Sequence, residues 1–148
     1  MSIVQTATTS FKVELPQGIH NFGPTSPDTF KIALYTAAAD LGYATTAYTT
    51  SGEVTGTNYV AGGNTLTITT TPVAANNSSN VPTAYFSFAN TSWTGATFTA
   101  RAALIYNVTE GNKSVAVLDF GSDKTVSNDT FQIIFPTADA NSAIVRIS

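Results

Sequence analysis

The chain has 148 residues, no cysteine and a formal net charge of −3. This length indicates one domain with its own core, and the lack of cysteine excludes disulfides and suits a protein made in a reducing cytoplasm. Only 10% of the residues are charged, and the six Lys and Arg residues stand singly along the sequence. Because phosphates and anionic lipids are bound by clustered cations, we expect no nucleic-acid partner and no membrane partner.

The first nine residues are rich in threonine, with Ile3 and Val4 among them. We interpret residues 1–9 as either a disordered end or an arm that adds a strand to the sheet edge of a neighbouring molecule. Residues 10–148 are expected to form a single domain, because neither half of this stretch has enough predicted strands to bury a core alone.

A short helix is predicted next. Ser10 precedes an amphipathic stretch with Glu14 near its end, a pattern typical of a capping box, and Pro16 is expected to end the helix after one or two turns. Residues 17–28 contain glycines and prolines and are predicted to be a loop. His20 lies in this loop, and a single histidine without cysteine lacks the partners of a conventional metal site, so we expect it to hydrogen-bond locally.

The middle of the chain alternates strand and turn signals. Residues 29–36 and 65–69 alternate apolar with polar residues and are predicted strands, as are residues 83–88. Between them, residues 72–82 are the most polar stretch and are rich in residues that interrupt strands, which predicts a long flexible loop. Residues 90–95 are predicted to be a turn.

The most prominent pattern is a pair of apolar runs within residues 101–121, separated by Glu-Gly-Asn at 110–112. Both runs carry apolar residues on both faces, which is typical of strands that lie in the middle of a sheet and are covered from both sides. Gly111 permits a tight reversal, so we expect a hairpin. Polar turns are predicted at residues 122–124 and 127–129.

Further strands are predicted at residues 130–135 and 143–147, and weaker ones near 48, 53–54 and 58–60. Seven to nine strands at near-regular spacing, with almost no helix, predict an all-β fold. The expected architecture is a two-sheet antiparallel β-sandwich, Ig-like or jelly-roll-like, with at most one short N-terminal helix.

The sequence predicts no catalytic residues, no metal site and no cofactor. Its acidic residues stand singly at turns and strand ends, where Asx turns explain them, and no calcium-loop motif surrounds Asp123 or Asp129. No glycine-rich phosphate loop follows a strand. We therefore expect that the protein is not an enzyme.

Aromatic and apolar residues near the N-terminus and in the loops are the best candidates for contact with a partner, because such side chains bury a large area with few rotatable bonds. These candidates are Ile3, Val4, Tyr43, Tyr48, Tyr59 and Trp93. For Trp93 the alternative is that the indole closes one end of the sandwich.

Four stretches carry a resemblance to a known family: SFKVELPQGIHNF at 10–22, DTFKIALYT at 28–36, ARAALIYN at 100–107, and the stretch from Val115 to Ile147. Together they resemble a family of small structural proteins of tailed bacteriophages. Pro16 departs from this family, in which helix-favouring residues are usual at that place. The resemblance implies a component of the virion, made in the host cytoplasm, and it does not distinguish head from tail.

The function that we expect from this resemblance is that of a capsid decoration, or cement, protein. Such a protein binds the outside of the shell of major capsid protein and stabilises it, and many weak contacts of a homo-oligomer on a symmetric lattice act together. The alternative is a structural module associated with the tail, neck or fibre, with the tail proteins as partners and a contact to the host surface. A glycan-active enzyme is the third interpretation, and it lacks an identifiable acid and base.

Overall fold

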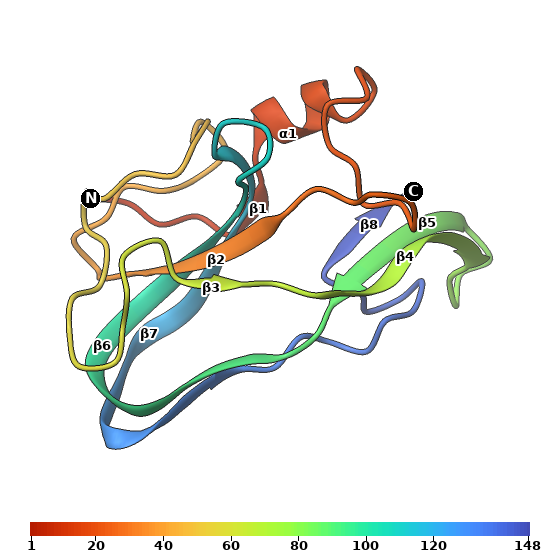
Figure 1. The fold of residues 1–148 in the computed structure, drawn as a ribbon. Coiled ribbons are helices and arrows are strands. Elements are labelled where there is room, and N and C mark those ends of the chain that lie inside the picture. The colour runs from red at the N-terminus through yellow and green to blue at the C-terminus, as the bar shows by residue number, and fades with distance from the viewer.

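The computed structural model describes all residues from 1 to 148, which form two antiparallel sheets and one short helix (Figure 1). The elements are β1 (Thr6–Ala7), α1 (Thr9–Glu14), β2 (Phe30–Tyr35), β3 (Asn64–Thr65), β4 (Ile68–Asn76), β5 (Pro82–Phe88), β6 (Thr91–Asn107), β7 (Lys113–Ile133) and β8 (Val145–Ile147). One sheet has the strand order β1-β7-β6-β2-β3 and the other the order β4-β5-β8. The predicted all-β sandwich with one short helix is confirmed.

The central hairpin is formed by β6 and β7, which pair antiparallel with Leu104 opposite Val117. Gly111 and Asn112 have positive φ values of 71° and 63°, as the predicted tight reversal requires. Residues on one face of the hairpin, such as Ile105, join the main core between the two sheets, and those on the other face, such as Leu104, join a second buried cluster. The hairpin is therefore covered from both sides, as its apolar pattern predicts.

Both strands of this hairpin are longer than expected, and three predicted turns are wrong. Residues 122–124 and 127–129 lie within β7, and residues 90–95 lie almost wholly within β6. The turn-forming residues are accommodated by irregularities in the ladder instead, at which Gly121 has φ 78° and Asn128 has φ 47°. The two strands consequently bend together, and Figure 1 shows the paired ribbon turning a corner and continuing toward the second sheet.

The predicted flexible loop at residues 72–82 is also wrong. Strand β4 continues to Asn76 and β5 begins at Pro82, so the connection is a tight turn in which the Asn77 N–H donates to the Val81 carbonyl at 3.0 Å. Strand β4 lies at the edge of its sheet and has register shifts on either side of Thr70. An edge strand tolerates proline and polar side chains, because one of its sides needs no hydrogen-bonding partner.

Smaller differences occur in the middle of the chain. The predicted strand at 65–69 is divided between β3 and the start of β4, and residues 58–60 form a turn rather than a strand. The weak strand signals near 48 and 53–54 correspond to isolated bridges, Ala47 with Lys113 and Tyr35 with Glu53.

Residues 1–9 follow the chain's own sheet. Strand β1 pairs with β7 at Val117 and Ala116, and Ile3 forms a bridge with Leu41. Residues 6–7 thus occupy an edge of β7 within the same molecule, and the contact of an N-terminal arm with a neighbouring molecule stays a prediction. The helix is capped by Thr8 rather than Ser10, because the Thr8 hydroxyl is the one that accepts from a helical N–H. It ends at Glu14, before Pro16, as predicted.

The main core is rich in aromatic side chains and lies between the two sheets. Phe22 stacks on Phe30 and Phe86 with ring centroids 4.3 and 4.0 Å apart, which joins the loop after α1 to both sheets. The second cluster lies on the opposite face of the five-stranded sheet, where Ala39 and Leu41 from the loop after β2 cover it. Loops, rather than a third sheet, therefore close that face.

Candidate functional site

Glu53 is the centre of a polar cluster in the loop that lies beside the open edge of β2. Its carboxylate accepts hydrogen bonds from the Tyr48 hydroxyl at 2.7 Å, the Tyr59 hydroxyl at 2.8 Å and the Gly62 N–H at 2.7 Å. The Tyr106 hydroxyl donates to the Gly62 carbonyl at 2.7 Å. Hydrogen bonds thus link residues 48, 53, 59–62 and 106 around the Glu53 carboxylate.

The tyrosines of this cluster share a raised pKa. Burial is the largest cause for Tyr35, Tyr48 and Tyr59, and the nearby Glu53 carboxylate raises the pKa of each hydroxyl further. The same two causes raise the pKa of Tyr106 to about 12. The hydroxyls are therefore protonated hydrogen-bond donors, which is the state that the carboxylate needs. We interpret the cluster as a clamp that fixes the loops on the sheet.

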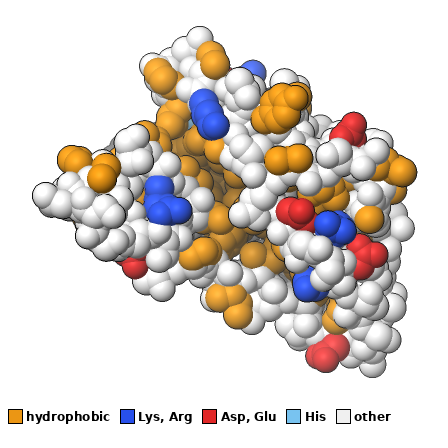
Figure 2. All heavy atoms as spheres, turned by 180° about the vertical axis from the view of Figure 1, so that it is seen from behind, with side chains coloured by type: hydrophobic (Ala, Val, Ile, Leu, Met, Phe, Trp, Pro, Cys, Tyr) orange, Lys and Arg blue, Asp and Glu red, His pale blue; other side chains and the backbone are white.

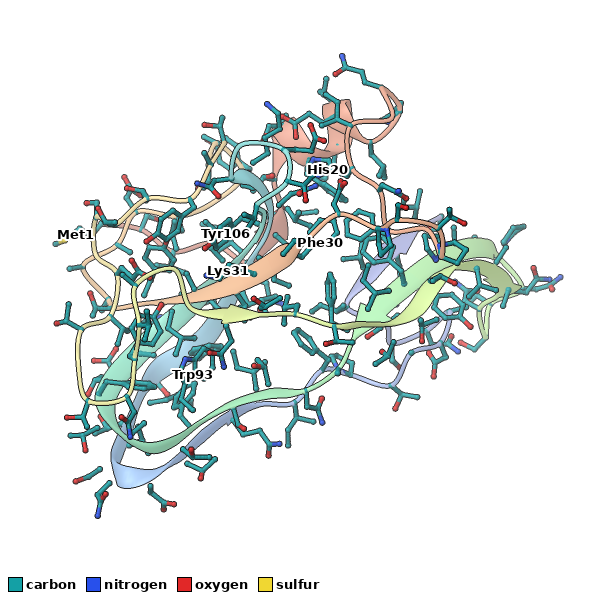
Figure 3. All side chains as sticks on the ribbon, in the orientation of Figure 1. Met1, His20, Phe30, Lys31, Trp93 and Tyr106 are labelled. Atoms are coloured by element: carbon teal, nitrogen blue, oxygen red, sulfur yellow. The ribbon has the colours of Figure 1, made fainter.

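His20 belongs to a second polar cluster, beside α1 (Figure 3). Its Nε2 lies 2.7 Å from Glu14 Oε2 and its Nδ1 lies 3.0 Å from Asn107 Nδ2. Asn107 Oδ1 accepts from the Glu110 N–H, so the amide NH2 group faces His20 and also donates to Asp28 at 2.8 Å. This arrangement assigns the ring proton to Nε2. The bond to Glu14, six positions away, confirms the predicted local bonding of His20, whereas the bond to Asn107, 87 positions away, was not predicted.

Three of the six predicted contact residues come together at one end of the molecule. Val4 and Tyr43 are 46% and 66% exposed, and both line a shallow depression of about 410 Å³ formed by the N-terminal residues and the loop 40–45. Ile3 lies next to them and packs against the second buried cluster. Val4 and Tyr43, here called the Val4 patch, are available to a partner.

The other three predicted contact residues are used inside the molecule. Tyr48 and Tyr59 are half-buried and donate to Glu53. Trp93 is 4% exposed and packs against Tyr59 and Phe131, so it closes the interior as the alternative interpretation holds. Figure 3 shows Trp93 between β3 and the bent part of the β6–β7 ribbon, far from His20.

A groove between α1 and β8 was not predicted from the sequence. It is about 390 Å³ in volume and is lined by Phe11, Leu15, Val145 and neighbouring residues. Figure 2 shows the hollow from behind, with apolar side chains on its floor. The groove joins segments that lie about 130 positions apart in the sequence, and no local pattern brings such segments together.

No group of three or more His, Asp or Glu side chains is arranged to hold a metal ion. No helix has the length and apolar character needed to cross a membrane. Comparison of the chain with protein-family models, curated proteins and solved structures finds no match.

Proposed function

We propose that the chain is a structural protein of a tailed-bacteriophage particle, most specifically a decoration protein on the outside of the capsid shell. The resemblance of four stretches of the sequence to small phage structural proteins supports this proposal. A chain in which only 10% of the residues are charged also suits a protein that contacts neighbours through hydroxyl, amide and apolar groups. The proposal gives the chain no catalytic role.

The observation that carries the proposal is the Val4 patch. Tyr43 and Val4 are both exposed and line the same depression. Their backbone is fixed, because the Val4 N–H donates to the Leu41 carbonyl and the Tyr43 carbonyl accepts from the Thr9 N–H, both at 2.9 Å. A rigid aromatic and aliphatic pair binds with little loss of conformational entropy. The binding energy of one such contact is small, but many linked copies on a symmetric lattice would bind together and so bind more tightly.

The proposal is tested by sedimenting purified particles that lack the protein together with added wild-type or variant chain. We expect about tenfold fewer copies of the double variant Val4→Ser, Tyr43→Ala than of the wild type on each shell, because the variant lacks two contact side chains. The matched control is Val60→Ser, because Val60 is 76% exposed and lies outside the patch. Thermal unfolding should be unchanged in both.

Equal occupancy of shells by the double variant and the wild type would contradict the role of the Val4 patch. Binding of the wild type to isolated tails, and not to heads, would favour the tail-associated alternative. No binding to either would remove both particle roles.

A further inference from the structure

The groove between α1 and β8 has the features of a site for an extended polypeptide segment. Its floor is formed by core side chains that are reached from outside, among them Phe11 from α1 and Val145 from β8. Ile147 lines it as well and is 48% exposed. The volume of about 390 Å³ is within the range of sites that bind a few side chains.

One wall of the groove is an open sheet edge. Strand β8 pairs only with β5, at positions 84–86, and its other side pairs with no strand. Across the groove, Ala7 of β1 belongs to the edge of the larger sheet. Backbone N–H and C=O groups at a sheet edge are matched best by another extended chain.

The charged side chains on the groove are both positive, and Ser148, the last residue of the sequence, lines the groove as well. Lys12 and Arg146 line it from α1 and from β8, and no Asp or Glu side chain lines it. Neither cation forms an ion pair within the chain, although Arg146 donates to the Asn141 carbonyl. Two unpaired cations on one groove are notable in a chain with six Lys and Arg and a net charge of −3.

We propose that this groove binds an extended segment of another protein in which apolar and acidic residues alternate, and that the segment adds as a strand to the free edge of β8. The apolar side chains would enter the floor, and the carboxylates would face Lys12 and Arg146. The proposal does not depend on the proposed function. The Val4 patch and the groove are lined by different residues, and the N- and C-termini lie on opposite sides of the molecule (Figure 1).

The structure of the chain's own apolar and acidic segments argues for a separate partner rather than a second copy of this chain. Val13-Glu14-Leu15 has the required pattern, but Glu14 lies in α1, where it is 2.7 Å from His20. Leu118-Asp119-Phe120 has it too, but Asp119 is opposite Ala102 within the β6–β7 ladder and bound to Arg101 at 3.0 Å. Either segment would have to leave its own element to enter the groove of a neighbour.

The test uses fluorescence anisotropy with a labelled ten-residue peptide of alternating valine and glutamate. Two comparison peptides carry lysine in place of glutamate, or serine in place of valine. We expect saturable binding of the first peptide at micromolar concentrations and at least about tenfold weaker binding of the other two. In the labelled protein, backbone NMR shifts should change at residues 145–147.

The double variant Lys12→Glu, Arg146→Glu should weaken binding of the valine–glutamate peptide about tenfold, since two attractive charges become repulsive. The matched control is Lys124→Glu, because Lys124 is an exposed cation outside the groove. The Val4→Ser, Tyr43→Ala variant should bind the peptide normally, which separates this proposal from the proposed function.

The proposal is overturned if the valine–glutamate peptide shows no saturable binding, or if the lysine peptide binds equally well. It is also overturned if binding to the wild type changes backbone shifts only at residues outside the groove. Sedimentation of the chain alone tests whether a second copy of the chain fills the groove. A dimer that forms with the wild type and not with the Lys12→Glu, Arg146→Glu variant would show this and would overturn the proposal of a separate partner.

Discussion

The Tyr59 hydroxyl donates to Glu53 at 2.8 Å and accepts from the backbone N–H of Leu34 at the same distance. One hydroxyl thus joins a loop carboxylate to the edge of β2, beyond the place where β3 stops pairing. The Val54 N–H donates to the Leu34 carbonyl at 2.9 Å, so both polar groups of this residue are satisfied by the loop. The loop therefore takes the place of a missing edge strand.

Replacing Glu53 should loosen this loop. Glu53→Ala removes the acceptor for two tyrosine hydroxyls and the Gly62 N–H, and we expect the free energy of unfolding to fall by about 3 kcal/mol. Chemical denaturation measures the change. Asp123→Ala is the control, since Asp123 is exposed and the same charge is lost; its effect should stay within about 0.5 kcal/mol. Equal effects of the two variants would contradict the clamp.

The tyrosine pKa values predict alkaline instability. A tyrosine in an unfolded chain has a pKa of about 10, and burial raises the pKa of Tyr106 to about 12 and raises that of Tyr59 as well. The folded state binds these hydroxyl protons more tightly than the unfolded state does. Their contribution to the free energy of unfolding is therefore complete below about pH 10 and is lost as the pH rises toward 12. The free energy of unfolding should be level from about pH 7 to 9 and then decline. A level profile up to pH 12 would contradict the buried geometry.

Asn107 is expected to matter more than any exposed amide. It is fully buried, and Asn107→Ala removes the donor to Asp28 and the partner of His20 Nδ1. We expect a loss of about 2–4 kcal/mol in the free energy of unfolding. Asn76→Ala is the matched control, because the Asn76 amide bonds only to Asn80 on the surface. A loss below about 1 kcal/mol for the buried variant would show that the cluster is weaker than its geometry implies.

Two glycines with similar backbone angles should respond differently to alanine. Gly63 has φ 74°, and a Cβ there would lie 1.8 Å from the Ile32 carbonyl oxygen. Gly111 has φ 71° with nothing within 4 Å of such a Cβ. Gly63→Ala should therefore cost about 3 kcal/mol or more, and Gly111→Ala about 1 kcal/mol from backbone strain alone. Thermal unfolding of both variants checks this, and equal costs would contradict the close approach of residue 63 to β2.

The parts of the fold that the sequence predicts are those with a strong local pattern. The hairpin within 101–121 follows from apolar residues on both faces and from Gly111 at its turn. Residues 70–76 of β4 were not predicted as a strand, because an edge strand exposed on both sides has no apolar alternation. The full length of β7 was missed because bulges accept the same residues as turns, and only pairing with β6 distinguishes the two.

The polar clusters depend on contacts that no local pattern encodes. His20 meets Asn107, which lies 87 positions away, so the sequence predicts a hydrogen-bonding role for His20 without identifying this partner. Glu53 has a weak local signal, since Tyr48 and Tyr59 lie within six positions of it. The same signal gave these tyrosines a surface role, because the sequence does not show which side of a loop faces the sheet.

We propose that the chain covers a phage shell, and this proposal is tested by the stoichiometry of purified particles. Quantitative mass spectrometry would count this chain against the major capsid protein. We predict a ratio between one to one and one copy per few capsid subunits, as expected for a protein that occupies equivalent sites on a symmetric lattice. A few copies per particle, or none in clean particles, would contradict the decoration role.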